Sequence, residues 1–258
     1  ELAAEVFVEM EPEQQELLIK SFSDNELREV LEEMYVDDTV DIIEEMPATV
    51  VKRILKHTDP ETRKKVNEIL KYPEDCAGSI MTTEFVDLKR DMTVSDALKR
   101  IRRTGVDKET INVCYVTDTS RHLLGTVSIR TLLLAEEEDV IEDIMETNII
   151  FATTMDDKED VANDLSKYDF LAMPVVDRES RLVGIVTIDD AIDVMEEEAT
   201  EDIELMAAIT PTDKPYLRTG VMETVKSRIP WLMLLMLSAT FTGIVISSFE
   251  DSLATCSV

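Results

Sequence analysis

The chain has 258 residues, enough for two or three compact domains. It carries 26 Lys and Arg residues against 56 Asp and Glu residues, a net charge of −30 at pH 7. Nucleic-acid binding is excluded by this charge, because phosphates are neutralised by Lys and Arg. Three widely separated cysteines and two isolated histidines provide neither a disulfide framework nor the ligand spacing of a zinc site.

Residues 1–76 read as a series of short helices, because apolar residues such as Leu27, Leu31 and Met34 recur at helical spacing. Ser23 with Glu26 forms a capping-box pattern, and Asp59 before Pro60 suits the start of another helix. Short helices joined by tight links predict a small superhelical domain.

An internal repeat follows. Ile80-Met81 recurs as Ile144-Met145 at an offset of 64 residues, and Gly125 and Val127 recur as Gly184 and Val186 at an offset of 59. The first copy, residues 77–142, therefore holds about five extra residues around 105–109, compared with the second copy, residues 143–204. Each copy predicts a strand, a helix, two strands and a helix. Units of this size bury little surface alone, so we expect the two copies to pack together with any ligand cleft between them.

Residues 205–228 are expected to connect the repeat to a membrane helix at 229–249. These 21 residues are uncharged and mainly apolar, and as a helix they reach about 31 Å, enough to cross a bilayer core. Lys226 and Arg228 precede the run, which places its N-terminal side in the cytoplasm. Ala239, Gly243 and Ser247 form a stripe of small residues suited to packing against another membrane helix. A buried helix of a soluble protein is the alternative.

Residues 143–204 contain 19 acidic and 4 basic residues, which is half of the net charge. On a helix starting near Asp189, acidic residues such as Asp190, Asp193 and Glu197 form one stripe without interleaved cations. A solvated helix face is the ordinary interpretation of such a pattern. A hard divalent cation, held by carboxylates and water, would relieve the repulsion.

The repeat resembles the paired CBS (cystathionine β-synthase-type) module, and its flanks resemble MgtE-type magnesium transporters. The matching stretches are 71–82 (KYPEDCAGSIMT), 167–177 (KYDFLAMPVVD), 184–190 (GIVTIDD), 198–203 (EATEDI) and 228–232 (RIPWL). The resemblance implies an α plus α/β protein: a helical superhelical N-terminal domain, a tandem CBS pair and a transmembrane helix. It implies magnesium transport by a multi-pass protein of the plasma membrane whose N-terminal domains are cytoplasmic. This part would be the magnesium-sensing gate that closes the pore at high magnesium, and not an enzyme.

The resemblance also implies site residues. Magnesium would bridge the helical domain, the CBS pair and the helix leading to the pore through Asp37, Asp41, Glu159, Asp169, Asp190, Glu198, Glu201 and Asp202. Asp37 and Asp41 lie one helical turn apart and can face one partner, although helix capping explains them equally well. The expected partners are magnesium ions, the membrane and a second copy of the chain in a homodimer.

A second implied site would hold ATP or a related adenine nucleotide. Thr187 and Asp190 supply the Ser/Thr-x-x-Asp pattern that holds ribose hydroxyls in CBS pairs, whereas the first repeat has Thr131 in place of the Asp. Arg130 and Phe170 match positions that contact phosphate and stack on adenine, a sensible pairing of a cation and a ring face. Phe170 is equally explained as a core residue, and Asp190 is claimed by both sites.

Two other functions remain open. The chain could be an adenine-nucleotide-sensing CBS module of another ion channel or exporter, which would need neither the acidic stripe nor the helical domain. A soluble enzyme with a regulatory CBS pair is disfavoured by the apolar run and by the lack of a catalytic arrangement in the sequence.

Overall fold

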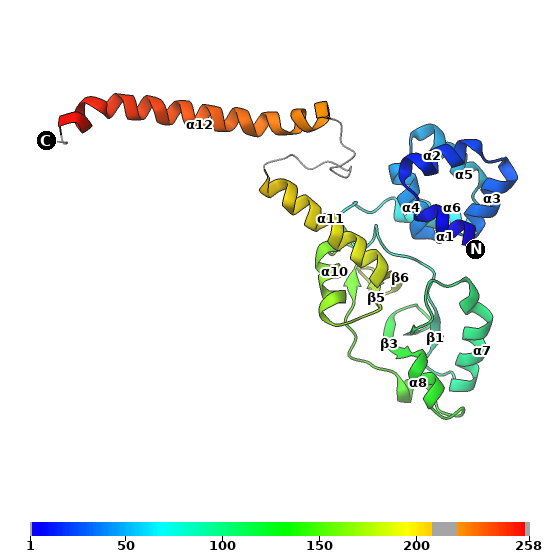
Figure 1. The fold of residues 1–258 in the computed structure, drawn as a ribbon. Coiled ribbons are helices and arrows are strands. Elements are labelled where there is room, and N and C mark those ends of the chain that lie inside the picture. Colours follow the sequence, from blue (N-terminus) through cyan, green and yellow to red (C-terminus); the bar gives the residue numbers. More distant parts are fainter. Residues whose placement is uncertain (1, 208–220, 256–258) are drawn as a thin grey trace. The chain divides into compact units, whose positions relative to one another are not determined.

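The computed structural model describes residues 2–207 and 221–255 of the chain (Figure 1). They fall into two compact units, Glu1–Val194 and Met195–Val258. Part of the predicted connecting segment, residues 208–220, lies outside the described residues.

Six short helices form the N-terminal domain, as the spacing of apolar residues predicts. They are α1 (Leu2–Val8), α2 (Pro12–Ser21), α3 (Asp24–Glu32), α4 (Val36–Glu45), α5 (Ala48–His57) and α6 (Pro60–Ile69). The capping box at Ser23 and Glu26 is present, and the Asp59 carboxylate accepts hydrogen bonds from the first turn of α6. Each helix turns one apolar face inward, and Leu27, Val40 and Ile54 are fully buried there.

The repeat forms two equivalent α/β units, each with a three-stranded sheet. The first contains β1 (Asp87–Lys89), α7 (Val94–Thr104), the 3₁₀ turn η1 (Gly105–Asp107), β2 (Val113–Thr117), β3 (Leu123–Ser128), α8 (Ile129–Leu134) and α9 (Ile141–Ile144). The second contains β4 (Ala152–Thr153), α10 (Lys158–Lys167), β5 (Ala172–Val176), β6 (Leu182–Thr187) and α11 (Ile188–Met206). In each sheet the middle strand pairs in parallel with the first strand and antiparallel with the third. The predicted α plus α/β fold is therefore confirmed.

The repeated Ile-Met segments cross between the two units. The backbone of Thr82, at the start of the first unit, pairs with Ile185 on β6 of the second unit through hydrogen bonds of 2.8 and 2.9 Å. Glu146 pairs in the same way with Thr126 on β3. Each crossing lies against a glycine: a Cβ added to Gly184 would meet Sδ of Met81 at 2.7 Å and the Thr82 carbonyl oxygen at 2.8 Å. The glycines that mark the repeat are therefore required by close backbone approach.

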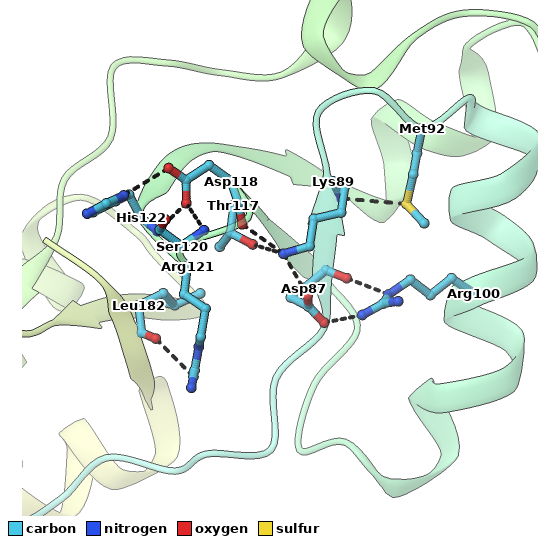
Figure 2. A network of polar contacts seen from close by, with 10 residues as sticks. All are labelled: Asp87, Lys89, Met92, Arg100, Thr117, Asp118, Ser120, Arg121, His122 and Leu182. Carbon is cyan, nitrogen blue, oxygen red and sulfur yellow. Dashed lines mark hydrogen bonds and ion pairs between the residues drawn. The ribbon is translucent and has the colours of Figure 1, made fainter.

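The hairpin turns of the two units also pair with each other, as Figure 2 shows from the side of the first unit. A guanidinium nitrogen of Arg121 donates to the Leu182 carbonyl oxygen at 3.1 Å, and the Leu182 amide donates to the Arg121 carbonyl oxygen at 2.9 Å. Around this turn, Asp118 accepts hydrogen bonds from the His122 ring and backbone, and Nζ of Lys89 donates to the Asp118 carbonyl oxygen. The two α/β units are thereby joined at the two strand crossings and at the hairpin turns.

The second compact unit holds the end of α11 and the helix α12 (Val221–Thr255). Within α12, residues 225–249 have a mean hydropathy of 2.0, and none of this stretch is buried. Among the described helices, α12 is the one that is long and apolar enough to cross a membrane, and it contains the predicted span 229–249.

Candidate functional site

A group of carboxylates brings α4 of the helical domain together with the beginning of α11. The apolar face of α4 packs into the core through Val36, Val40 and Ile43. This orientation determines where the acidic residues of the same helix lie. Asp37 is only 6% exposed, and its Oδ1 accepts no hydrogen bond. Burial raises the pKa of Asp37 well above its usual range, and the charge of Asp190 on α11 raises it further. A buried carboxylate oxygen that accepts no hydrogen bond is energetically costly, and Oδ1 of Asp37 has no counter-charge to offset that cost.

Asp41 and Asp190 complete the contact that the sequence predicts. Asp41 keeps solvent on one side, yet desolvation by the surrounding protein, then the charges of Asp190 and Asp38, raise its pKa to about 8. Asp190 is half-buried at the first turn of α11, and burial followed by the charge of Asp189 raises its pKa to about 7. A 2.5 Å hydrogen bond donated by Oγ1 of Thr187 to Oδ2 of Asp190 partly opposes this shift. The structure therefore brings together Asp37, Asp41 and Asp190.

Three further acids belong to this group, and the sequence interpretation missed them. Asp38 neighbours Asp37 on α4, and burial is the first cause that raises its pKa to about 6. Asp189 precedes Asp190, and its charge acts on both Asp38 and Glu109. Glu109 lies just after η1, and burial followed by the charge of Asp190 raises its pKa to about 8. The only signal for Glu109 in the sequence was its place in the five extra residues of the first copy. We call these six residues the acidic cluster: Asp37, Asp38, Asp41, Glu109, Asp189 and Asp190.

The acidic cluster suits a hydrated divalent cation better than a bare one. Within residues 2–207 and 221–255, no three His, Cys, Asp or Glu side chains converge closely enough to enclose a metal ion directly. Magnesium retains several of its waters and binds proteins through one or two carboxylates, so wider spacing is compatible with it. The unpartnered Oδ1 of Asp37 supplies an acceptor for such an ion.

The other predicted metal-binding residues lie elsewhere. Glu159 is exposed in the first turn of α10, and Asp169 is exposed with a left-handed backbone, φ 54°. Glu198, Glu201 and Asp202 lie on α11 beyond Val194, in the second compact unit. Of these three, Glu198 is half-buried and the other two are exposed.

A cavity of about 740 Å³ lies between the two α/β units. Arg130 and Phe170 both line it, together with Ser128 and Thr131 at the start of α8. The described residues of its wall include neither Thr187 nor Asp190, so the four predicted nucleotide residues are split. The Ser128 and Thr131 hydroxyl oxygens lie 2.8 Å apart in a hydrogen bond.

Phe170 is held at this cavity by an aromatic neighbour. Its ring stacks on that of Tyr168, with centroids 5.6 Å apart, and Nζ of Lys167 lies 4.5 Å from the Tyr168 ring centroid. Phe170 is half-buried and packs against the core while it lines the cavity. Phe170 therefore packs against the core and lines the cavity at the same time, and its stacking on adenine stays a prediction.

Comparison with known proteins identifies each domain. Residues 1–75 match the model of the MgtE intracellular N domain, and residues 77–138 and 141–197 match the CBS domain. The magnesium transporter MgtE of Thermus thermophilus is 39% identical over 255 residues, which are 97% of this chain and 56% of that protein. The magnesium transporter MgtE of Bacillus subtilis is 36% identical over 249 residues, 95% of this chain and 54% of that protein. The chain thus spans somewhat more than half the length of these curated relatives.

A solved structure agrees with these relatives. The cytosolic domain of the Mg²⁺ channel MgtE in complex with ATP superimposes with a TM-score of 0.71 at 40% identity, covering 74% of this chain and 79% of that one. The helical domain, the CBS pair and their order along the chain are thereby accounted for together. The chain belongs to the MgtE family.

Proposed function

We propose that this chain is the cytosolic, magnesium-sensing part of a magnesium transporter and that it closes the pore when cytosolic magnesium is high. The observation that carries the proposal is the buried carboxylate of Asp37, whose Oδ1 accepts no hydrogen bond and which lies where the charge of Asp190 acts on it. The names of the relatives support the choice of magnesium. The activity is regulated transport rather than catalysis.

The mechanism follows from the charges of the acidic cluster. At low magnesium, the carboxylates of α4 repel those at the start of α11, which favours separation of the helical domain from the CBS pair. At high magnesium, hydrated ions bridge Asp37 and Asp41 to Asp190 and stabilise the closed arrangement. Since the ions bind the closed arrangement better, they shift the population toward it in proportion to that differential affinity.

One attractive contact opposes the repulsion without any metal. Nζ of Lys65 on α6 lies 2.6 Å from Oε1 of Glu84, which is 9% exposed at the beginning of the first α/β unit. The Glu84 carboxylate is shielded while the Lys65 side chain is 41% exposed, so the ion pair is partly screened by solvent. The ion pair holds α6 of the helical domain against the first α/β unit, while magnesium binding controls the position of α4.

The remaining predicted metal-binding residues are further magnesium ligands in this proposal. Glu159 and Asp169 present carboxylates on the second α/β unit, and Glu198, Glu201 and Asp202 continue the acidic surface along α11. We assign α12 as the first transmembrane helix of a multi-pass plasma-membrane protein, with the preceding domains in the cytoplasm. The stripe of Ala239, Gly243 and Ser247 then faces another membrane helix, and the protein acts as a homodimer.

ATP is the second proposed ligand, and the cavity beside Arg130 and Phe170 is its site. A guanidinium for phosphate and a braced ring for adenine both line this cavity, one from each α/β unit. The related structure that contains ATP supports this choice. Nucleotide bound there would contact both α/β units and so stiffen the pair.

The direct test is magnesium-dependent closure of the whole chain in detergent micelles. Hydrogen–deuterium exchange of α4 should slow as magnesium rises into the millimolar range, with ionic strength held constant by sodium chloride. The response should be steeper than one-site binding, because several ions act together. Equal protection by sodium chloride alone would reduce the effect to screening and refute magnesium sensing.

A further inference from the structure

The first CBS repeat takes part in the acidic cluster through one residue, Glu109. The carboxylate atom Oε2 of Glu109 is fully shielded from solvent and accepts no hydrogen bond. Asp37 Oδ1 is in the same state. Two carboxylate oxygens from different domains therefore lack partners, and each carboxyl group feels the charge of Asp190.

The backbone holds Glu109 in place. Its amide donates to the Glu84 carbonyl oxygen at 2.9 Å, and η1 forms a compact turn immediately before it. Gly105 starts that turn, and a Cβ added there would meet Cγ2 of Ile111 at 2.9 Å. The five extra residues of the first copy thus form an ordered structure that presents one carboxylate.

The neighbouring acid Glu84 already has partners of its own. Lys65 pairs with Oε1 of Glu84, and Oε2 of Glu84 accepts from the Thr82 hydroxyl at 3.1 Å. Glu84 instead contributes another negative charge that acts on Glu109. The shielded Oε2 of Glu109 has no hydrogen-bond partner, and acidic side chains surround it, so the group is placed like one that binds a cation.

We propose that Glu109 is a binding residue for the cation that bridges Asp37 and Asp190, so that closure joins three elements: α4, the turn after η1 and the start of α11. This inference rests on the proposed magnesium-sensing function. The contact runs through the water shell of the ion, since magnesium keeps most of its waters in protein sites. Through Glu109, the position of the first CBS repeat enters the magnesium response.

The sign of one substitution separates this role from simple repulsion. The Glu109→Gln substitution keeps the shape of the side chain and removes its charge. If Glu109 only repels its neighbours, removing the charge makes closure easier, and less magnesium is needed. If Glu109 holds the ion, removing the charge weakens binding, and more magnesium is needed. Residues that act on a bound metal without ligating it directly typically contribute about tenfold or more to the affinity for that metal.

The experiment uses the whole chain in detergent and follows hydrogen–deuterium exchange of α4 during a magnesium titration at constant ionic strength. We expect Glu109→Gln to raise the magnesium midpoint by about tenfold and to reduce the steepness of the response. Glu138→Gln, which changes an exposed acid of the same repeat, is the matched control and should leave the midpoint unchanged. A midpoint that is unchanged or lowered in Glu109→Gln overturns the inference.

Two further arms keep the outcome interpretable. Glu109→Asp keeps the charge but withdraws it by one methylene group. Its magnesium midpoint should therefore lie between those of the wild type and Glu109→Gln. If Glu109→Gln fails to fold, an unchanged midpoint in Glu109→Asp counts against binding. If Asp37→Asn raises the midpoint and Glu109→Gln does not, only this inference fails. If the wild type shows no magnesium-specific protection, the proposed function fails and this inference with it.

Discussion

The carboxyl groups of Asp37 and Asp190 lie close enough for the charge of Asp190 to raise the pKa of Asp37 beyond the effect of burial, although the two residues belong to different domains. Oδ1 of Asp37 has no hydrogen-bond donor, and Oδ2 of Asp190 is tied to the Thr187 hydroxyl at 2.5 Å. The closed arrangement thus carries an electrostatic strain that a cation relieves. The first predictions follow from this strain.

Asp37→Asn should have opposite effects on stability with and without magnesium. In the presence of a chelator and at alkaline pH, where the buried Asp37 carboxyl group is ionised, removing its charge raises the melting temperature of the helical and CBS domains. In millimolar magnesium, the variant loses the stabilisation that the ion gives the wild type. Differential scanning calorimetry under both conditions checks this, and a variant that melts below the wild type under chelator would contradict it. Glu29→Gln, which changes an exposed acid of α3, is the control for charge removal.

Stability in the absence of magnesium should fall as the pH rises from about 4 to about 8. Asp41 has a pKa raised by burial and by Asp190 to about 8, against an ordinary value of 3.8. Between these values the folded protein binds more protons than the unfolded chain, so raising the pH destabilises the fold. Urea unfolding in chelator over this range should show the decline. Magnesium should flatten it at the alkaline end, because a bound cation replaces the proton.

ATP binding should depend on Arg130 and Phe170 and not on Asp190. Phe170→Ala removes the stacking ring, and loss of such a contact typically costs about 1–3 kcal/mol. Arg130→Ala should weaken ATP more than adenosine, because the guanidinium binds the phosphates. Isothermal titration calorimetry measures both. A large loss of affinity in Asp190→Asn, with Arg130→Ala unaffected, would instead place the nucleotide beside Thr187.

Gly184→Ala should destabilise the CBS pair by about 1–3 kcal/mol, the usual cost of overpacking. The new Cβ would meet Sδ of Met81, which can shift, and the carbonyl oxygen of Thr82, which is fixed by its hydrogen bonds to Ile185. Ser166→Ala, at an exposed position of α10 in the same repeat, is the control. Chemical denaturation of both variants decides whether the crossing is as tight as the structure indicates.

Most of the fold could be predicted from local sequence patterns. The capping box at Ser23 reports on short-range geometry, which a sequence expresses directly, and the recurring glycines reveal the repeat because they recur at a fixed offset. The acidic cluster is different, because its members come from three segments far apart in the chain. The resemblance supplied Asp37, Asp41 and Asp190, but nothing local distinguishes Glu109 from the many other acids of the sequence.

The nucleotide residues show the same limit. Thr187 and Asp190 fit a local pattern, and the hydrogen bond between them exists. Which cavity that pattern faces depends on how the two units pack, and the described cavity is lined by Ser128 and Thr131 instead. The sequence distinguishes the two copies at this pattern, Thr131 in the first against Asp190 in the second, but not which of the two borders the cavity.

The pairing of Thr82 with Ile185 also constrains how the protein is made. These two residues are separated by about a hundred positions, so the ribosome releases the segment around Thr82 long before its partner strand exists. The helical domain emerges first and has its own capped helices, whereas the linker behind it must wait unpaired. We therefore expect the CBS pair to acquire protease resistance in one late step, after residue 185 leaves the exit tunnel, and ribosome-bound chains truncated before that point to be cleaved near Thr82.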